Sequence, residues 1–122
     1  MKSELNAGGL DNLIRQYEDA ATMIGVYTES GDYKKGDREY IRLKDAYREI
    51  RRHGREGQSR HLSLLDSDVL SVRVWAAAHA LEYAPEVAEP VLEYLSKNAP
   101  GIQQLNAEMT LREWRAGRLS LE

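Results

Sequence analysis

The placement of proline constrains this chain more than any other feature of its sequence. All three prolines lie between Pro85 and Pro100, so residues 1–84 lack the residue that interrupts helices most strongly. Leu and Ala, which favour helices, together number 28, whereas the β-branched residues Ile, Val and Thr together number 14. The sequence therefore predicts an all-α fold with no sheet.

Apolar residues recur at steps of three and four, which places them on one face of each of several successive helices. Asp37 is the predicted N-cap of the second helix, and Gly54 and Gly57 are predicted to end it. Pro90 falls in the first turn of the fifth helix, and the fourth is apolar nearly all round, which is typical of a central helix. The predicted helices span residues 9–30, 37–53, 59–65, 68–83, 86–97 and 102–116.

The 122 residues have the size of a single domain, and the absence of Cys excludes disulfides and thiolate metal sites. The N-terminus has no apolar signal-peptide core, and no apolar run is long enough to span a membrane. We therefore expect one cytoplasmic domain over residues 1–122 that has no membrane partner, no metal site and no cofactor.

The last predicted helix carries two apolar stripes on opposite arcs, although a terminal helix that faces solvent needs only one. The first stripe consists of Ile102, Leu105 and Met109, and the second consists of Ala107, Leu111 and Trp114. We expect the second stripe to be covered either by the tail that carries Leu119 and Leu121 or by another copy of the chain. The surplus stripe thus predicts a homodimer.

Residues 64–95 contain, in order, two leucines, an Asp-containing turn, Val72-Arg73, an Ala-rich helix and a second segment of Ala, Val and Leu. This order resembles a HEAT-type helical repeat, although Val69-Leu70 stand where that pattern usually has Asp-Pro. The resemblance implies a HEAT-like α-α superhelix, a right-handed array of helical hairpins with about six helices.

Two further runs carry a closer resemblance. They are residues 72–77 (Val-Arg-Val-Trp-Ala-Ala) and the closing residues 106–119, which begin Asn-Ala-Glu-Met and contain Arg-Glu-Trp-Arg-Ala-Gly. Over most of its length the chain resembles a family of short bacterial proteins called domain of unknown function 2019. That resemblance implies a compact HEAT-like helical fold and no established activity.

The same resemblance assigns a structural role to one arginine. In HEAT-type repeats the Arg of the Val-Arg pair usually bonds to an Asp in the preceding turn, so Arg73 is expected to pair with Asp66 or Asp68. We interpret these three residues as a structural clamp rather than as a ligand site.

Trp75, His79 and Glu82 lie on the only polar arc of the fourth predicted helix. Since Trp is enriched at interaction hot spots, these residues are candidates for partner binding, together with Leu111 and Trp114. One alternative is that a neighbouring helix covers Trp75. Another is that Trp75 and His79 line the pocket of a small-ligand-binding protein or an enzyme.

Positive charge is concentrated in the middle of the chain. Residues 34–61 hold 10 Lys or Arg against 5 Asp or Glu, whereas residues 62–122 hold 5 against 9. The candidate phosphate-binding patch lies within residues 48–60 and consists of Arg48, Arg51, Arg52 and Arg55. Acidic residues three positions before Arg48 and Arg52 favour a salt-bridged solvated face instead, and the pI of 5.7 is not typical of a nucleic-acid-binding domain.

Catalytic signatures are missing from the sequence, which has no Gly-x-Ser-x-Gly elbow, no phosphate-binding loop and no Gly-x-Gly-x-x-Gly. We therefore predict a non-catalytic protein–protein interaction module, with toxin immunity and an adaptor role as its two concrete versions. The alternatives are a ligand-binding protein or enzyme with a site at Trp75 and His79, and nucleic-acid binding through residues 48–60.

Overall fold

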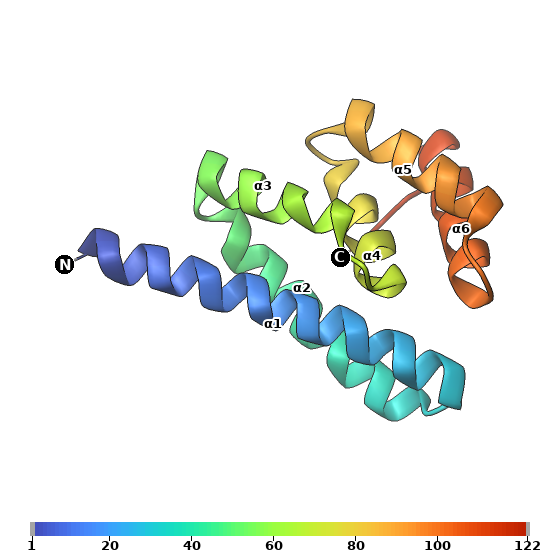
Figure 1. Ribbon diagram of the computed structural model, residues 1–122, viewed down its shortest axis with the longest axis horizontal. Helices are drawn as coiled ribbons and strands as arrows, with labels where there is room; N and C mark the ends of the chain where they lie inside the picture. Colours follow the sequence, from blue (N-terminus) through green and yellow to red (C-terminus); the bar gives the residue numbers. More distant parts are fainter. Residues whose placement is uncertain (1, 122) are drawn as a thin grey trace. The chain divides into compact units, whose positions relative to one another are not determined.

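A computed structural model describes residues 2–121, with side chains for residues 9–121. Over this range the chain forms six α-helices, one short 3₁₀ helix and no strand, so the prediction of an all-α fold is confirmed (Figure 1). The chain divides into two compact units, which we call unit 1 (residues 1–61) and unit 2 (residues 62–122) and describe separately.

Unit 1 is built on two long helices, α1 (Lys2–Ser30) and α2 (Tyr33–Arg51), which pack side by side (Figure 1). α1 starts at Lys2 rather than at residue 9, because Gly9 lies inside the helix and does not begin it. Most buried residues lie three, four or seven positions apart on each helix, and so share one face, as the apolar periodicity predicted. They are Leu10, Tyr17, Ala20 and Ala21 on α1, and Leu43, Ala46, Tyr47 and Ile50 on α2.

The turn between these two helices differs from the prediction. α2 starts at Tyr33, and its N-cap is Asp32, whose side chain accepts a hydrogen bond from the Lys35 backbone N–H at 3.2 Å. Gly31, with a φ of 78°, makes the sharp reversal before this cap. Asp37 therefore lies inside α2 and is not its N-cap, since Asp32 already satisfies a free N–H group one turn earlier.

The helix α3 (Gly54–Leu62) lies where the sequence predicted a break followed by a helix over residues 59–65. Gly54, with a φ of 61°, lets the chain turn from α2 into α3. Gly57 does not end a helix but is buried inside α3, against the backbone of Ile50 near the end of α2. A Cβ atom at position 57 would lie 2.1 Å from the Ile50 carbonyl oxygen, so this close approach requires glycine.

Unit 2 is centred on α4 (Leu70–Ala80), which contacts the 3₁₀ helix η1 (Ser63–Asp66), α5 (Pro85–Asn98) and α6 (Ile102–Arg115). Nearly every side chain of α4 is buried, including all of its alanines. Small side chains let neighbouring helices approach closely, so the prediction that this segment is a central helix is confirmed for unit 2.

The boundaries of α4 and α5 differ from the prediction at two points. α4 starts at Leu70 rather than at residue 68, because the Ser67 hydroxyl accepts a hydrogen bond from the Val69 N–H at 3.1 Å and holds the turn without an Asp cap. α5 starts at Pro85, which places Pro90 inside the helix rather than in its first turn. Pro90 is exposed, and the helix continues past it with one backbone hydrogen bond fewer.

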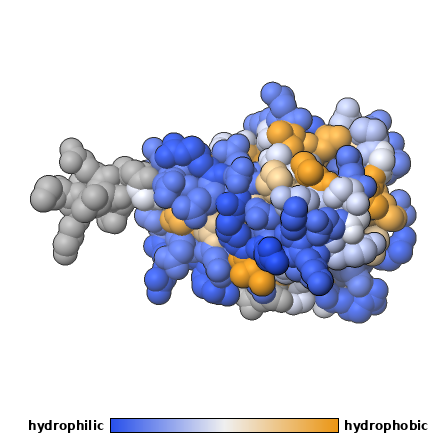
Figure 2. Space-filling view, turned by 90° about the horizontal axis from the view of Figure 1, so that it is seen from below, coloured by the Kyte–Doolittle hydropathy of each residue, from blue (hydrophilic) through white to orange (hydrophobic). Residues whose placement is uncertain are grey.

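Within residues 2–121, no helix combines the length and the apolar character that a membrane crossing needs. Large apolar side chains nevertheless reach the surface, and Figure 2 shows orange apolar residues among blue hydrophilic ones on one face. The large apolar residues that are exposed are Val26, Tyr33, Ile41, Val69, Val87, Tyr94, Leu105 and Met109.

The contact at Gly57 gives the first prediction. Gly57→Ala should lower the free energy of unfolding by about 1–3 kcal/mol, because the new methyl group forces the α2 backbone and α3 apart. Gly36→Ala is the matched control: its Cβ would lie 3.8 Å from the Tyr27 Cβ, and it should stabilise α2 by about 0.5–1 kcal/mol. Urea denaturation measures both, and equal effects of the two substitutions would refute the close crossing.

Candidate functional site

The helices α5 and α6 form a hairpin that brings charged side chains from both helices to one groove. Ala99 is extended, as expected for a residue before proline, and Pro100 and Gly101 follow it. Gly101 has a φ of 64°, a left-handed conformation that reverses the chain into α6. The short connection makes α5 and α6 neighbours, and the two helices pack against each other.

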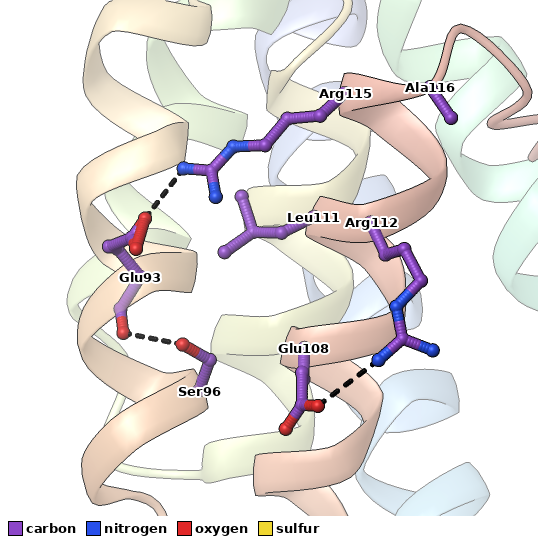
Figure 3. A pocket seen from close by; sticks show the side chains of 7 residues that line it. All are labelled: Glu93, Ser96, Glu108, Leu111, Arg112, Arg115 and Ala116. Atoms are coloured by element: carbon purple, nitrogen blue, oxygen red, sulfur yellow. Dashed lines mark hydrogen bonds and ion pairs between the residues drawn. The ribbon is translucent and has the colours of Figure 1, made fainter.

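An open groove of about 540 Å³ lies along this hairpin (Figure 3). Its apolar part is the buried side chain of Leu111, and two Arg and two Glu residues surround it. The groove is lined by Glu93 and Ser96 from α5, by Glu108, Leu111, Arg112 and Arg115 from α6, and by Ala116.

Arg115 joins the two helices across the groove. Its guanidinium donates to a carboxylate oxygen of Glu93 at 2.6 Å and lies 3.5 Å from a carboxylate oxygen of Glu89. The hydrogen bond from Arg115, and then its positive charge, lower the pKa of Glu93. The same hydrogen bond raises the pKa of Arg115, so this pair stays charged across the neutral range.

The remaining charges of the groove are also paired. Arg112 donates to Glu108 at 3.2 Å along α6, and the Ser96 hydroxyl donates to the Glu93 backbone carbonyl at 2.7 Å (Figure 3). Within residues 9–121, no three His, Cys, Asp or Glu side chains gather as they would around a metal ion. The groove therefore offers an apolar floor and a rim of matched charges, which suits contact with another surface.

The structure places the two apolar stripes of α6 on the opposite sides from those predicted. The second stripe faces its own unit: Ala107 and Leu111 are buried, and the half-buried Trp114 donates its indole N–H to Glu89 of α5 at 3.1 Å. Leu111 and Trp114 therefore hold the hairpin together, and the expectation that a second copy of the chain would cover this stripe is wrong. The outward residues belong to the first stripe, in which Leu105 is 47% exposed and Met109 is 50% exposed.

Trp75, His79 and Glu82 do not form a common surface. Trp75 is half-buried and its ring centroid lies 6.1 Å from that of His79, which is only 2% exposed. Glu82 is exposed in the turn that follows α4. The groove on the α5–α6 hairpin includes none of these three residues.

Arg73 binds a backbone group. Its Nε–H donates to the Leu65 carbonyl oxygen at 3.3 Å, which ties α4 to η1. This partner differs from the predicted carboxylate of Asp66 or Asp68, both of which are exposed. In the described part of the chain, no ion pair joins Arg73 to either residue. The carbonyl is accessible because η1 ends at Asp66 and leaves its last carbonyl groups without helical partners.

The candidate basic patch is exposed but largely engaged. Arg48 lies 3.4 Å from Asp45, and Arg52 lies 3.6 Å from Glu49, as the three-residue spacing predicted. The Arg51 guanidinium lies over the Tyr47 ring at 5.9 Å, and Arg55 is exposed at the start of α3. Arg48 and Arg51 lie on α2, Arg52 is the C-cap of α2, and Arg55 lies on α3.

Sequence reasoning missed an aromatic cluster in unit 1, formed by Tyr17 of α1, Tyr47 of α2 and His61 of α3. The His61 ring lies 5.0 Å from Tyr17 in an edge-on arrangement and 5.1 Å from Tyr47. His61 is fully buried, and this burial lowers its pKa to about 3. Tyr17 and Tyr47 lie on predicted apolar stripes, but no local pattern links them to His61.

These observations define the chain as a small all-α protein whose helices pack within two compact units. No protein-family model matches it, and no curated protein does either. The structure is similar to the crystal structure of the protein RPA1889 from Rhodopseudomonas palustris, with a TM-score of 0.79 and 20% sequence identity over 91% of this chain and 92% of that chain. At this identity the similarity shows a shared fold alone.

The Arg73 contact predicts which substitutions weaken unit 2. Arg73→Ala should lower the melting temperature, with a loss of about 1–3 kcal/mol, because the half-buried Leu65 carbonyl loses its charged donor. Asp66→Asn and Asp68→Asn should leave the melting temperature unchanged. A drop for either Asp variant that matches the drop for Arg73→Ala would instead support the carboxylate clamp.

The burial of His61 predicts acid sensitivity in unit 1. Below pH 6.5 the unfolded chain takes up a proton on His61 that the folded chain accepts only near pH 3, so folding stability falls as the pH falls between these values. Relative to His61→Phe, the parent should lose up to about 1.4 kcal/mol per pH unit. Urea denaturation of both proteins at pH 7, 6, 5 and 4.5 measures this difference in the free energy of unfolding. Both proteins have the same carboxylates, so the effects of carboxylate titration cancel in the difference. Parallel pH profiles would contradict the prediction.

Proposed function

We propose that this protein is a non-catalytic protein-binding module of the cytoplasm, and that its α5–α6 hairpin carries the binding surface. The proposal includes the HEAT-like arrangement of the helices and membership in the domain of unknown function 2019 family, on the sequence resemblance described above. It leaves toxin immunity and an adaptor role as two versions of the same activity.

One observation carries the proposal: the hairpin holds large apolar side chains in solvent at helical spacing. On α5, Val87 and Tyr94 are exposed one heptad apart, and on α6, Leu105 and Met109 are exposed four residues apart. Exposed apolar residues at such spacing are typical of helical surfaces that bind another protein.

The charges of the hairpin support the same function. Glu93 and Arg115, and likewise Glu108 and Arg112, neutralise each other at the groove on the same hairpin. A rim of matched charges limits the cost of removing the surface from water, since few charges lose their partners on burial.

The helical-repeat part of the proposal draws on the packing within unit 2. α4 packs on α5 through an Ala-rich face, and α5 in turn packs on α6. In helical arrays each pair buries one face on the next pair, so the last helix keeps an outer face for a partner.

The alternatives draw less support from the geometry. His79 is buried beside Trp75, so a ligand at these two residues would require a local opening of α4. Arg48 and Arg52 of the basic patch each have an acidic residue within 4 Å, which offsets their attraction for phosphates.

Affinity capture tests the proposal. A tagged chain should retain a protein from its source cells, and Tyr94→Glu should reduce the retained amount about tenfold or more, because a charge replaces an apolar contact. Tyr33→Glu, on an exposed tyrosine of unit 1, is the matched control and should retain the partner.

The captured partner must then bind the purified chain in a titration with the same difference between the two variants. Loss of folding in Tyr94→Glu is excluded by circular dichroism. Specific capture that neither Tyr94→Glu nor Met109→Glu weakens would place the binding surface elsewhere, and failure to retain any protein would refute the proposal.

A further inference from the structure

The outer face of α6 carries a heptad pattern. Ile102, Leu105, Met109, Arg112 and Ala116 follow one another at steps of three and four, which is the spacing of the seam residues in a coiled coil. They lie opposite the side of α6 that Ala107, Leu111 and Trp114 bury inside the hairpin. On this face, Leu105 and Met109 are about half exposed.

The charges beside this seam specify how a second copy could lie on it. Glu108 and Arg115 occupy equivalent flanking positions one heptad apart, on the side that borders the groove. In an antiparallel pair of α6 helices these positions face each other, so Glu108 of each copy meets Arg115 of the other. A parallel pair would instead place Glu108 opposite Glu113, and the two like charges would repel.

The antiparallel register also matches the seam residues. With Glu108 opposite Arg115, Met109 of one copy packs on Arg112 of the other, and Leu105 packs on Ala116. Arg112 already bonds to Glu108 in its own helix at 3.2 Å, so its aliphatic stem can cover Met109 while the guanidinium stays paired. Arg115 reaches across the groove to Glu93 and Glu89, and its side chain is 52% exposed, so a further carboxylate can reach it.

We propose that a second copy of this chain docks on the outer face of α6, with the two α6 helices antiparallel and two Glu108–Arg115 pairs between the copies. This inference rests on the proposed function, since it takes protein binding as the role of the hairpin and names the chain itself as one partner. The seam is short, so the dimer forms and dissociates with concentration.

Sedimentation equilibrium over a wide concentration range tests the interface. The parent mass should rise from one copy towards two, and Leu105→Glu should weaken self-association about tenfold or more, because it places an unpaired charge against Ala116 of the other copy. Val26→Glu, on α1, is the matched control with 49% exposure against 47% for Leu105, and it should dimerise like the parent.

A charge exchange tests the register. Glu108→Arg and Arg115→Glu should each self-associate more weakly than the parent, and an equimolar mixture should associate more strongly than either variant alone, because the mixed dimer restores both pairs. Melting curves confirm that each variant is folded, which matters for Arg115→Glu because it also loses Glu93 and Glu89.

A parent mass of one copy at every concentration overturns the inference, as does a dimer that Leu105→Glu leaves intact. A mixture no stronger than its components overturns the antiparallel register. Affinity capture of a partner by a monomeric parent would refute this interface and leave the proposed function standing. A dimer that captures no other protein would refute the proposed function and leave this interface standing.

Discussion

The packing of unit 2 depends on the small side chains of α4. Four alanines, at positions 76, 77, 78 and 80, are buried on this helix, and the neighbouring elements can approach its backbone as closely as a methyl group allows. Larger residues there would push α5 outward, and α6 would follow because Trp114 and Arg115 tie it to Glu89 of α5. The positions of the groove and of the outer face of α6 therefore depend on the alanines of α4.

Short-range patterns predicted most of the fold, and contacts between distant residues account for what they missed. The apolar periodicity predicted six helices, although the third lies at residues 54–62 and not at 59–65, and the apolar content of the fourth segment marked the central one of unit 2. Gly57 was misread as a helix end because its role depends on the Ile50 carbonyl, which belongs to the preceding helix. His61 gave no local signal because its neighbours, Tyr17 and Tyr47, are distant in sequence.

The candidate site was also predicted only in part, because contacts between distant residues decide the rest. The sequence revealed that α6 has one apolar stripe too many, but both stripes are apolar, and only the packing of α6 on α5 and α4 decides which of them is buried. Ala107 and Leu111 fit the tight side of the hairpin, whereas Met109 lies on the outer side. The partner of Arg73 could not be predicted for a related reason. It is a backbone carbonyl that is free because η1 ends there, and residue types do not indicate which backbone carbonyls are free.

The crossing of α3 over the end of α2 also bears on how relatives of this chain could be recognised. A helix that rests directly on a backbone carbonyl tolerates no side chain at the point of contact, whatever the chemistry of the residues around it. Helix faces can exchange Leu for Met or Lys for Arg and keep their packing, so pairwise identity decays quickly in small helical proteins. A glycine in the third helix, seven residues after the apolar residue whose carbonyl it touches, would survive that decay as a mark of common descent.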